Sequence, residues 1–340
     1  MRLFSEFKLG IICAASLALS FTSLHAQAPK PGAFTWDGIL RSDDHGKTWV
    51  PEIKSPLIFE QMTQDTKGTY YALATKDNEE APTVYETSSI AKGWTPSPIP
   101  PKLLNGERPM SVLPMANGSA FLLLEHRLLQ SRDGGKNWTL VSASLPADFN
   151  EILAGPDQSM IAVSQTEVYR SDNDGKTWQS LHFNFNPIDS AVLINNDSMM
   201  VLLSCNTNLY SFASKKLTPF HAPGSDCPEN TNNFASPEPN VLLISTYHTI
   251  VRSDDNEKTW HVVLPIPKGS SCVRLQSGKD GVVIATVISD KSRISLYRST
   301  DSGKTWEKIQ MLPAGHSVST FLFAADGKIY AAVNQARGDE

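Results

Sequence analysis

Acidic residues recur along the chain in a form that could hold a metal ion. The strongest example spans residues 170–178 and reads RSDNDGKTW, and alternating carboxylates on a short loop are ligands that Ca²⁺ prefers. A calcium loop of the helix-loop-helix type needs acidic residues at alternating positions before its glycine and a glutamate six residues after it. Counting from Gly175, Arg170 occupies one of those positions and Leu181 another. The spacing does not fit, and we predict no metal site.

The same octet occurs five times, and its residue types suit a tight hairpin turn. An Asp or Asn side chain accepts hydrogen bonds from the backbone of its own turn, and glycine adopts a positive φ at no steric cost. The hydroxyl groups add local bonds, and the tryptophan covers apolar surface between neighbouring sheets. We therefore predict a structural role for Ser42, Asp44, Gly46, Trp49, Ser131, Asp133, Gly135, Trp138, Ser171, Asn173, Gly175, Trp178, Ser253, Asp255, Trp260, Ser299, Asp301, Gly303 and Trp306.

Two degenerate copies complete a repeat. Residues 84–94 (VYETSSIAKGW) keep the frame without its acidic residue, and residues 208–217 (NLYSFASKKL) keep the strand but lose the turn. The copies lie about 40 to 45 residues apart, the length of a four-stranded propeller blade. Alternating β-branched runs surround them, and no long stretch has a helical period. The sequence predicts an all-β fold, a seven-bladed β-propeller of four-stranded blades.

The two ends of the chain are expected to share one blade. Residues 319–333 supply two strands without an octet, whereas residues 38–50 supply an octet with no strand pair before it. A composite blade closes the ring and removes open sheet edges. We place the propeller at residues 36–334, after a linker at 27–35 and before a tail at 335–340.

The N-terminus predicts export. Arg2 and Lys8 precede the apolar stretch 9–24, and small residues follow, which is typical of a secretory signal over residues 1–26 that is cleaved after Ala26. The stretch is short for a membrane anchor, so we expect a secreted or periplasmic monomer without a transmembrane segment. The net charge of -5 and the lack of a Lys/Arg run argue against nucleic-acid binding.

Export leaves three cysteines, Cys205, Cys227 and Cys272, in an oxidising compartment. These residues allow one disulfide and one free thiol. We prefer a bridge from Cys205 to Cys227, which would pin the loop 221–233, and a bridge from Cys227 to Cys272 stays open as the alternative. No spacing of cysteine and histidine suggests a cofactor.

The octets match the Asp-box, or BNR, repeat, and residues 36–333 resemble the Asp-box propeller superfamily. Sialidases, xyloglucan-active glycosidases, sortilin-type receptors and photosystem II assembly-factor propellers belong to it. The resemblance implies that the octets lie on one face, at the turn between the third and fourth strands, and that binding sites lie on the opposite face. It also assigns the arginines before the octets, Arg41, Arg170, Arg252 and Arg298, to the octet face as structural or solvated residues.

The first strands of the seven repeats share a polar position, and first strands line the central channel of a propeller. That position is occupied by Gln61, Ser111, Glu151, Ser190, Asn233, Arg274 and Thr320. Water in the channel would also explain the polarity. Turns and connections on the same face add Arg108, Glu125, His126, Arg127, Tyr247, His248 and Arg293 as candidate binding residues. Together with Arg274 the cationic groups could receive a carboxylate, although charges on exposed loops are ordinary.

These features favour an exported, non-catalytic propeller that binds a protein or glycan partner through the face opposite the octets. A sialidase needs an arginine clamp, a Tyr–Glu nucleophile and six blades, and its Arg-Ile-Pro motif is absent from this sequence. Other glycosidases need two carboxylates about 6.5 to 9.5 Å apart or closer, and the ring of first-strand residues offers only Glu151. A glycoside hydrolase with its site at the channel mouth is the alternative.

Overall fold

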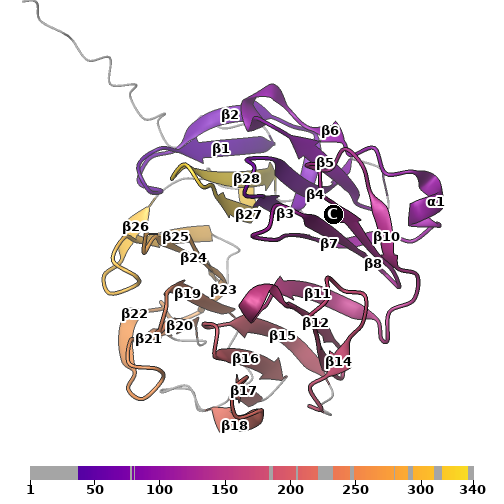
Figure 1. The fold of residues 1–340 in the computed structure, drawn as a ribbon. Helices are drawn as coiled ribbons and strands as arrows, with labels where there is room; N and C mark the ends of the chain where they lie inside the picture. The colour runs from indigo at the N-terminus through magenta and orange to yellow at the C-terminus, as the bar shows by residue number, and fades with distance from the viewer. Residues whose placement is uncertain are drawn as a thin grey trace, which may run out of the picture.

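Four-stranded antiparallel sheets form around the repeats, and seven of them stand about a common axis (Figure 1). The structure is a computed structural model. It describes residues 37–76, 79, 81–183, 187–203, 206–220, 233–245, 249–278, 280–289, 294–309 and 316–335. The expected seven-bladed β-propeller is confirmed.

Six blades take four consecutive strands each, and the first strand lies nearest the axis. Blade 1 contains β3 (Leu57–Gln64), β4 (Tyr70–Lys76), β5 (Thr83–Thr87) and β6 (Thr95–Pro96). Blade 2 contains β7 (Pro109–Pro114), β8 (Ala120–Leu124), β9 (Leu128–Ser131) and β10 (Thr139–Ser142). Blade 3 contains β11 (Phe149–Ala154), β12 (Met160–Ser164), β13 (Val168–Ser171) and β14 (Gln179–Ser180).

Blades 4 to 6 repeat this order. Blade 4 contains β15 (Ile188–Leu193), β16 (Ser198–Leu203), β17 (Asn206–Ser211) and β18 (Lys216–Phe220). Blade 5 contains β19 (Asn233–Glu238), β20 (Val241–Ser245), β21 (Thr249–Ser253) and β22 (His261–Pro265). Blade 6 contains β23 (Ser270–Ser277), β24 (Val283–Ser289), β25 (Ile294–Ser299) and β26 (Glu307–Ile309).

Blade 7 joins the two ends of the chain. It contains β27 (His316–Phe323), β28 (Ile329–Gln335), β1 (Gly38–Ser42) and β2 (Val50–Lys54). Strand β1 pairs antiparallel with β28 from Gly38 opposite Val333 to Ser42 opposite Ile329. The indigo and yellow strands lie side by side in Figure 1. The predicted composite blade is therefore present.

In the described ranges, helical structure is confined to short turns between strands. The described residues form two 3₁₀ turns, η1 (Ile90–Lys92) and η2 (Pro156–Gln158), and one α-helix, α1 (Pro101–Leu104). No helix in the described ranges is long and apolar enough to cross a membrane.

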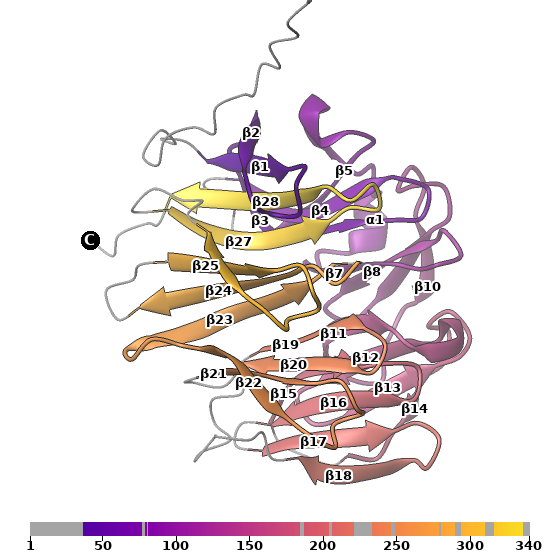
Figure 2. The ribbon, with the colours of Figure 1, turned by 90° about the vertical axis from the view of Figure 1, so that its left-hand side faces the viewer.

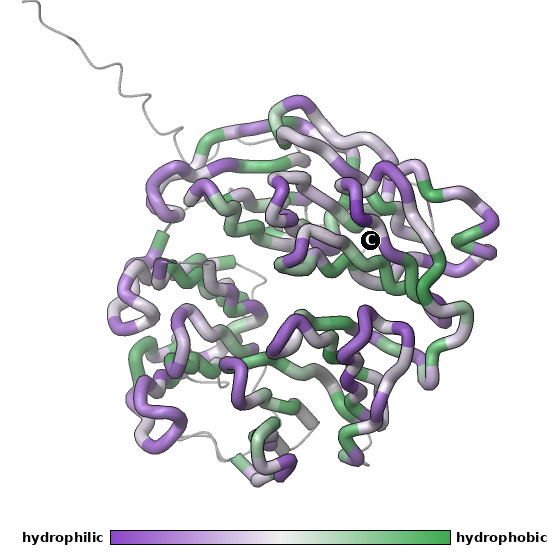
Figure 3. Tube along the Cα trace, viewed as in Figure 1, coloured by the Kyte–Doolittle hydropathy of each residue, from purple (hydrophilic) through white to green (hydrophobic). Residues whose placement is uncertain are grey.

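The core lies between the blades rather than in one central layer. Among the described residues, buried apolar side chains form seven clusters, one at each junction of neighbouring blades. At the closing junction, for example, Ile39 and Leu322 of blade 7 pack with Phe59 of blade 1. Figure 3 shows the apolar positions along the strands and the hydrophilic ones at the turns. Each sheet therefore packs its two faces against its neighbours in the ring.

Each intact octet folds into a turn that is held by its own side chains. In blade 7 the Gly46 amide donates to the Ser42 hydroxyl at 2.8 Å, and the Ser42 hydroxyl donates to the Asp44 carboxylate at 2.8 Å. That carboxylate also accepts from the Thr48 amide at 2.8 Å. The serine accepts an equivalent amide in blades 2, 3, 5 and 6. The octet carboxylates are thus bonded within their turns.

The octet glycine lies against the preceding blade. A Cβ atom added to Gly303 would meet two methyl carbons of Leu243 in blade 5 at 2.6 Å, and one added to Gly175 would collide with Leu128 of blade 2. Gly303 also has a φ of 81°, a conformation that side chains with a Cβ rarely adopt. Position 303 therefore needs glycine for both its backbone conformation and its contact with Leu243.

Replacement of Gly303 by alanine should destabilise the ring through this contact. Gly327 has a φ of 84° and open space around its added Cβ, so Gly327→Ala is a matched control for the backbone strain alone. We expect Gly303→Ala to lower the free energy of unfolding by about 1–3 kcal/mol more than Gly327→Ala, the usual cost of overpacking. Chemical denaturation measures the difference. Equal losses of unfolding free energy in the two variants would show that the contact with Leu243 does not constrain position 303.

The octet carboxylates should also make stability depend on pH. Hydrogen bonds from the Thr259 hydroxyl and amide to Asp255, at 2.6 and 2.9 Å, lower the pKa of its carboxyl to about 2. A carboxyl whose pKa is lowered by folding stabilises the fold above its unfolded pKa of about 4 and loses that contribution as the pH falls. Asn173 makes the matching bond to the Thr177 amide at 2.9 Å in blade 3, so Asp255→Asn keeps the turn.

We expect the difference in unfolding free energy between wild type and Asp255→Asn to be largest at neutral pH. It should shrink as the pH falls from about 4 to about 2. Chemical denaturation at several pH values measures it. A difference that stays constant over this range would mean that the carboxylate charge adds nothing to the turn.

Candidate functional site

The two faces of the propeller differ in the turns that they present. In an antiparallel blade the turn between the first two strands and the turn between the last two lie at the same end. The octets are the turns between third and fourth strands, so this end is called the octet face and the other the opposite face. Figure 2 shows the strands from the side, with turns at both ends. Glu238, the last residue of β19, accepts a hydrogen bond from the Ser302 hydroxyl of an octet, which agrees with this arrangement.

A β-bulge precedes the ring position in six of the seven inner strands. The register shifts just before Gln61, Ser111, Glu151, Ser190, Arg274 and Thr320. In β19 the shift lies instead between Ala235 and Glu238. A bulge bends an edge strand and redirects its side chains, and it blunts the edge against further pairing. Six of the seven inner strands are therefore irregular at the equivalent position.

Two ring residues bond the backbone of another blade. The Gln61 amide group donates to the Val112 carbonyl at 3.1 Å, and its oxygen accepts from the Val112 amide at 2.9 Å. The Asn233 amide group donates to the Cys272 carbonyl at 3.3 Å. These side chains connect neighbouring inner strands, a contact that the sequence pattern did not reveal.

The other ring residues differ in burial. Ser111 and Thr320 are buried, with 8% and 4% exposed. Glu151 and Arg274 are half-buried. Burial lowers the pKa of the Arg274 guanidinium, and the side chain has no hydrogen-bond or ion-pair partner among the described residues. Arg274 is thus a partly desolvated cation in the ring.

The state of Cys272, near Arg274 in β23, differs from one of the two disulfide pairings expected from the sequence. Cys272 is a free cysteine, 1% exposed, so the alternative bridge from Cys227 to Cys272 is wrong. Burial raises the pKa of its thiol to about 11, and its sulfur lies 3.4 Å from the Arg274 carbonyl. A buried, protonated thiol is chemically inert.

Carboxylates already hold the candidate residues in the turn between β8 and β9. The Arg127 Nε lies 3.0 Å from Glu107 Oε1, and the His126 amide donates to Glu107 Oε2 at 2.9 Å. The His126 ring lies 3.1 Å from the Asp148 carboxylate. Arg108 next to them is exposed, whereas Glu125 is half-buried. In the part of the chain that is described, no contact joins this group to Arg274.

Several candidates fall outside the described residues. These are Tyr247, His248, Arg293, Cys205 and Cys227, together with the leader 1–26 and its cleavage site. Within the described ranges, no three His, Cys, Asp or Glu side chains form a group that could hold a metal ion.

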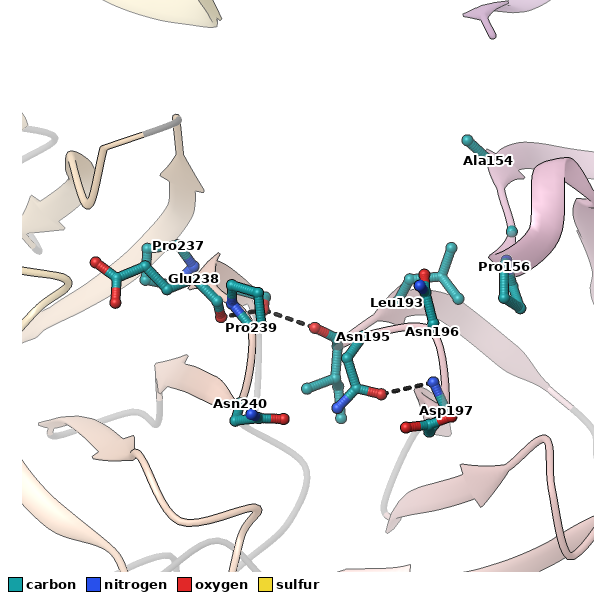
Figure 4. A pocket seen from close by; sticks show the side chains of 13 residues that line it. Ala154, Pro156, Leu193, Asn195, Asn196, Asp197, Pro237, Glu238, Pro239 and Asn240 are labelled. Carbon is teal, nitrogen blue, oxygen red and sulfur yellow. Dashed lines mark hydrogen bonds between the residues drawn. The ribbon is translucent and has the colours of Figure 1, made fainter. Parts of the chain in front are cut away.

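A cavity of about 520 Å³ on the octet face was not expected (Figure 4). It lies between the turns that join the first two strands of blades 3, 4 and 5, around Pro156, Asn195 and Pro239. The Asn195 side-chain oxygen accepts from the Asp197 amide at 2.8 Å. The Glu238 carboxylate points away from Asn195 in Figure 4 and accepts from Ser302. Prolines and asparagines make up nearly half of the residues that line the cavity.

Comparison with known proteins agrees with the architecture. Residues 59–187 match the family model of the DUF6242 beta propeller domain. No curated protein matches the chain.

Solved structures of low sequence identity share the fold. A structure of YCF48 bound to D1 peptide is 17% identical with a TM-score of 0.63, and the match covers 90% of this chain and 100% of that one. YCF48 from Cyanidioschyzon merolae is 17% identical with a TM-score of 0.59, over 83% and 97%. The GH74 enzyme of Niastella koreensis is 14% identical with a TM-score of 0.54, over 89% and 69%. At such identity these structures support the propeller fold alone.

Proposed function

We propose that the protein is an exported, non-catalytic propeller that binds a protein partner through the face opposite the octets. The proposal also includes cleavage of the leader after Ala26, a propeller domain at residues 36–334 and a monomeric state. The octets are proposed to be Asp boxes with a structural role.

Arg274 carries the proposal. A partly desolvated guanidinium without an anionic partner is unfavourable for the free protein, and such groups are retained where a binding function needs them. Its planar group of N–H donors suits a carboxylate from a partner. Arg108 adds an exposed positive charge at the edge of the same face. The structural likeness to YCF48 with a bound D1 peptide supports the use of this architecture for protein recognition.

The small number of acidic residues at the ring positions argues against a glycosidase. Hydrolysis of a glycosidic bond needs two acidic side chains that flank the substrate, and of the seven ring positions only Glu151 is acidic. A likeness to a GH74 enzyme is present, but this chain supplies no second ring carboxylate. The experiment below therefore includes a test for glycosidase activity beside the test for partner binding.

Arg274→Gln should reduce partner binding without loss of stability. Affinity capture from envelope extract, quantified by mass spectrometry, should recover about tenfold less of the partner, because one charge-assisted pair is lost. The free energy of unfolding should stay within about 0.5 kcal/mol of wild type, since no described contact is removed.

Arg252→Gln is the matched control on the octet face. The Arg252 side chain is 7% exposed, and its Nε donates to the Ser302 carbonyl at 2.9 Å. This variant should lose about 1–3 kcal/mol of stability and still capture the partner. Equal capture by Arg274→Gln would contradict the proposal. The proposal would also be contradicted if the protein hydrolysed a fluorogenic sialoside or a glucan oligosaccharide and Glu151→Gln abolished that hydrolysis.

A further inference from the structure

The junction between blades 3 and 4 differs from the others because the repeat of blade 4 has lost the octet turn together with its glycine and tryptophan. Four residues, 212–215, connect β17 to β18, whereas residues 172–178 connect β13 to β14 in blade 3. The shorter turn has neither the octet glycine nor the tryptophan. The outer part of this junction therefore lacks the cover that an octet provides.

Arginines before the octets reach the octet turn of the next blade where that turn exists. The Arg252 Nε of blade 5 donates to the Ser302 carbonyl of blade 6 at 2.9 Å. The Arg298 Nη1 of blade 6 donates to the Asp44 carbonyl of blade 7 at 3.0 Å. These guanidinium groups are used in the contact between blades.

Arg170 occupies the same position in blade 3, but blade 4 offers no octet turn. Its Nε donates to the Asp172 carboxylate at 2.7 Å, and its Cζ lies 5.7 Å from the centre of the Phe212 ring. Neither terminal nitrogen of this guanidinium has a hydrogen-bond acceptor among the described residues.

Arg41 shows that an arginine can find other hydrogen-bond acceptors where the next blade has a degenerate octet. Arg41 lies in blade 7, and the next blade in the ring is blade 1, whose octet is degenerate. The Arg41 Nη1 nevertheless donates to Glu52 at 2.6 Å and its Nε to Asp43 at 3.0 Å. Carboxylates of its own blade therefore engage both sides of this guanidinium. Arg170 has only one such partner in the described part of the chain.

A cavity of about 670 Å³ opens beside Arg170, and one wall of it is apolar. Leu181, Tyr210 and Phe212 contribute to this wall. The rings of Tyr210 and Phe212 lie 5.3 Å apart at 90°, and Tyr210 is 4% exposed. The wall is therefore fixed by aromatic packing.

The charged side chains that line the cavity are mainly cationic. Arg170 and Lys215 face one acidic residue, Asp172, which is engaged by the Arg170 Nε. Lys215 is exposed and has no ion-pair partner among the described residues. The cavity thus combines a positive charge with an apolar surface.

We propose that this cavity binds a carboxylate that is attached to an aromatic or aliphatic group, as in an acidic peptide segment. The two free nitrogens of Arg170 match the two oxygens of a carboxylate. Lys215 adds positive charge, and the Phe212 ring covers the apolar group. The site is separate from the Arg274 face, so either proposal can fail without the other.

The probe is N-acetylphenylalanine, with its uncharged amide as the matched ligand. The methyl resonances of Leu181 report binding during a titration of the purified protein. The carboxylate should bind about tenfold more tightly than the amide, and Arg170→Gln should bring its affinity to that of the amide. Arg41→Gln, where the guanidinium is already engaged, should leave the affinity unchanged.

Thermal unfolding of both variants checks that the fold is retained. Equal affinity for carboxylate and amide, or an unchanged affinity in Arg170→Gln, would overturn the proposal. Glucuronate carries the charge without an aromatic group, and it should bind more weakly. If it binds as tightly as N-acetylphenylalanine, the role of the apolar wall is refuted.

Discussion

The amide of the octet glycine donates to the hydroxyl of the serine that begins the octet, and the resulting turn lies against the preceding blade. In blade 6 this bond joins Gly303 to Ser299 at 2.9 Å, and Leu243 of blade 5 fills the space that a Cβ atom would need. A single four-stranded sheet cannot bury its own faces. The octets add contacts at the outer edge to the apolar clusters between the blades, and the ring depends on both.

The octet of blade 5 and the two degenerate repeats show which parts of this interaction can be lost. In blade 5 Glu257 replaces the glycine, adopts a φ of 60° and still donates its amide to Ser253 at 3.1 Å. Blade 1 keeps Trp94, whose ring lies 5.7 Å from that of Phe59. Blade 4 loses both glycine and tryptophan, and a cavity lined by Phe212 opens there. The second proposed site thus lies where the octet turn is missing.

Sequence predicts the blade count and the shared blade because the octet chemistry lies within eight consecutive residues. The contacts of the polar first-strand residues could not be predicted in this way. Gln61 and Val112 are 51 residues apart and bond only because two inner strands converge on the axis. The bulges before Gln61 and Arg274 have no local signature, and the Asn233 side chain bonds the Cys272 carbonyl, which lies 39 residues further along the chain. Position in the fold was thus readable from the repeats, whereas the contacts of the candidate residues were not.

Native-state hydrogen exchange of the Gly303 amide tests most directly whether the octet turns hold the ring. Ala285 in β24 is fully buried and reports global unfolding of the same blade. The account predicts that both amides exchange with the same free energy and the same dependence on denaturant. Fast exchange of Gly303 that is independent of denaturant, while Ala285 stays protected, would show that the turn opens without consequence for the ring.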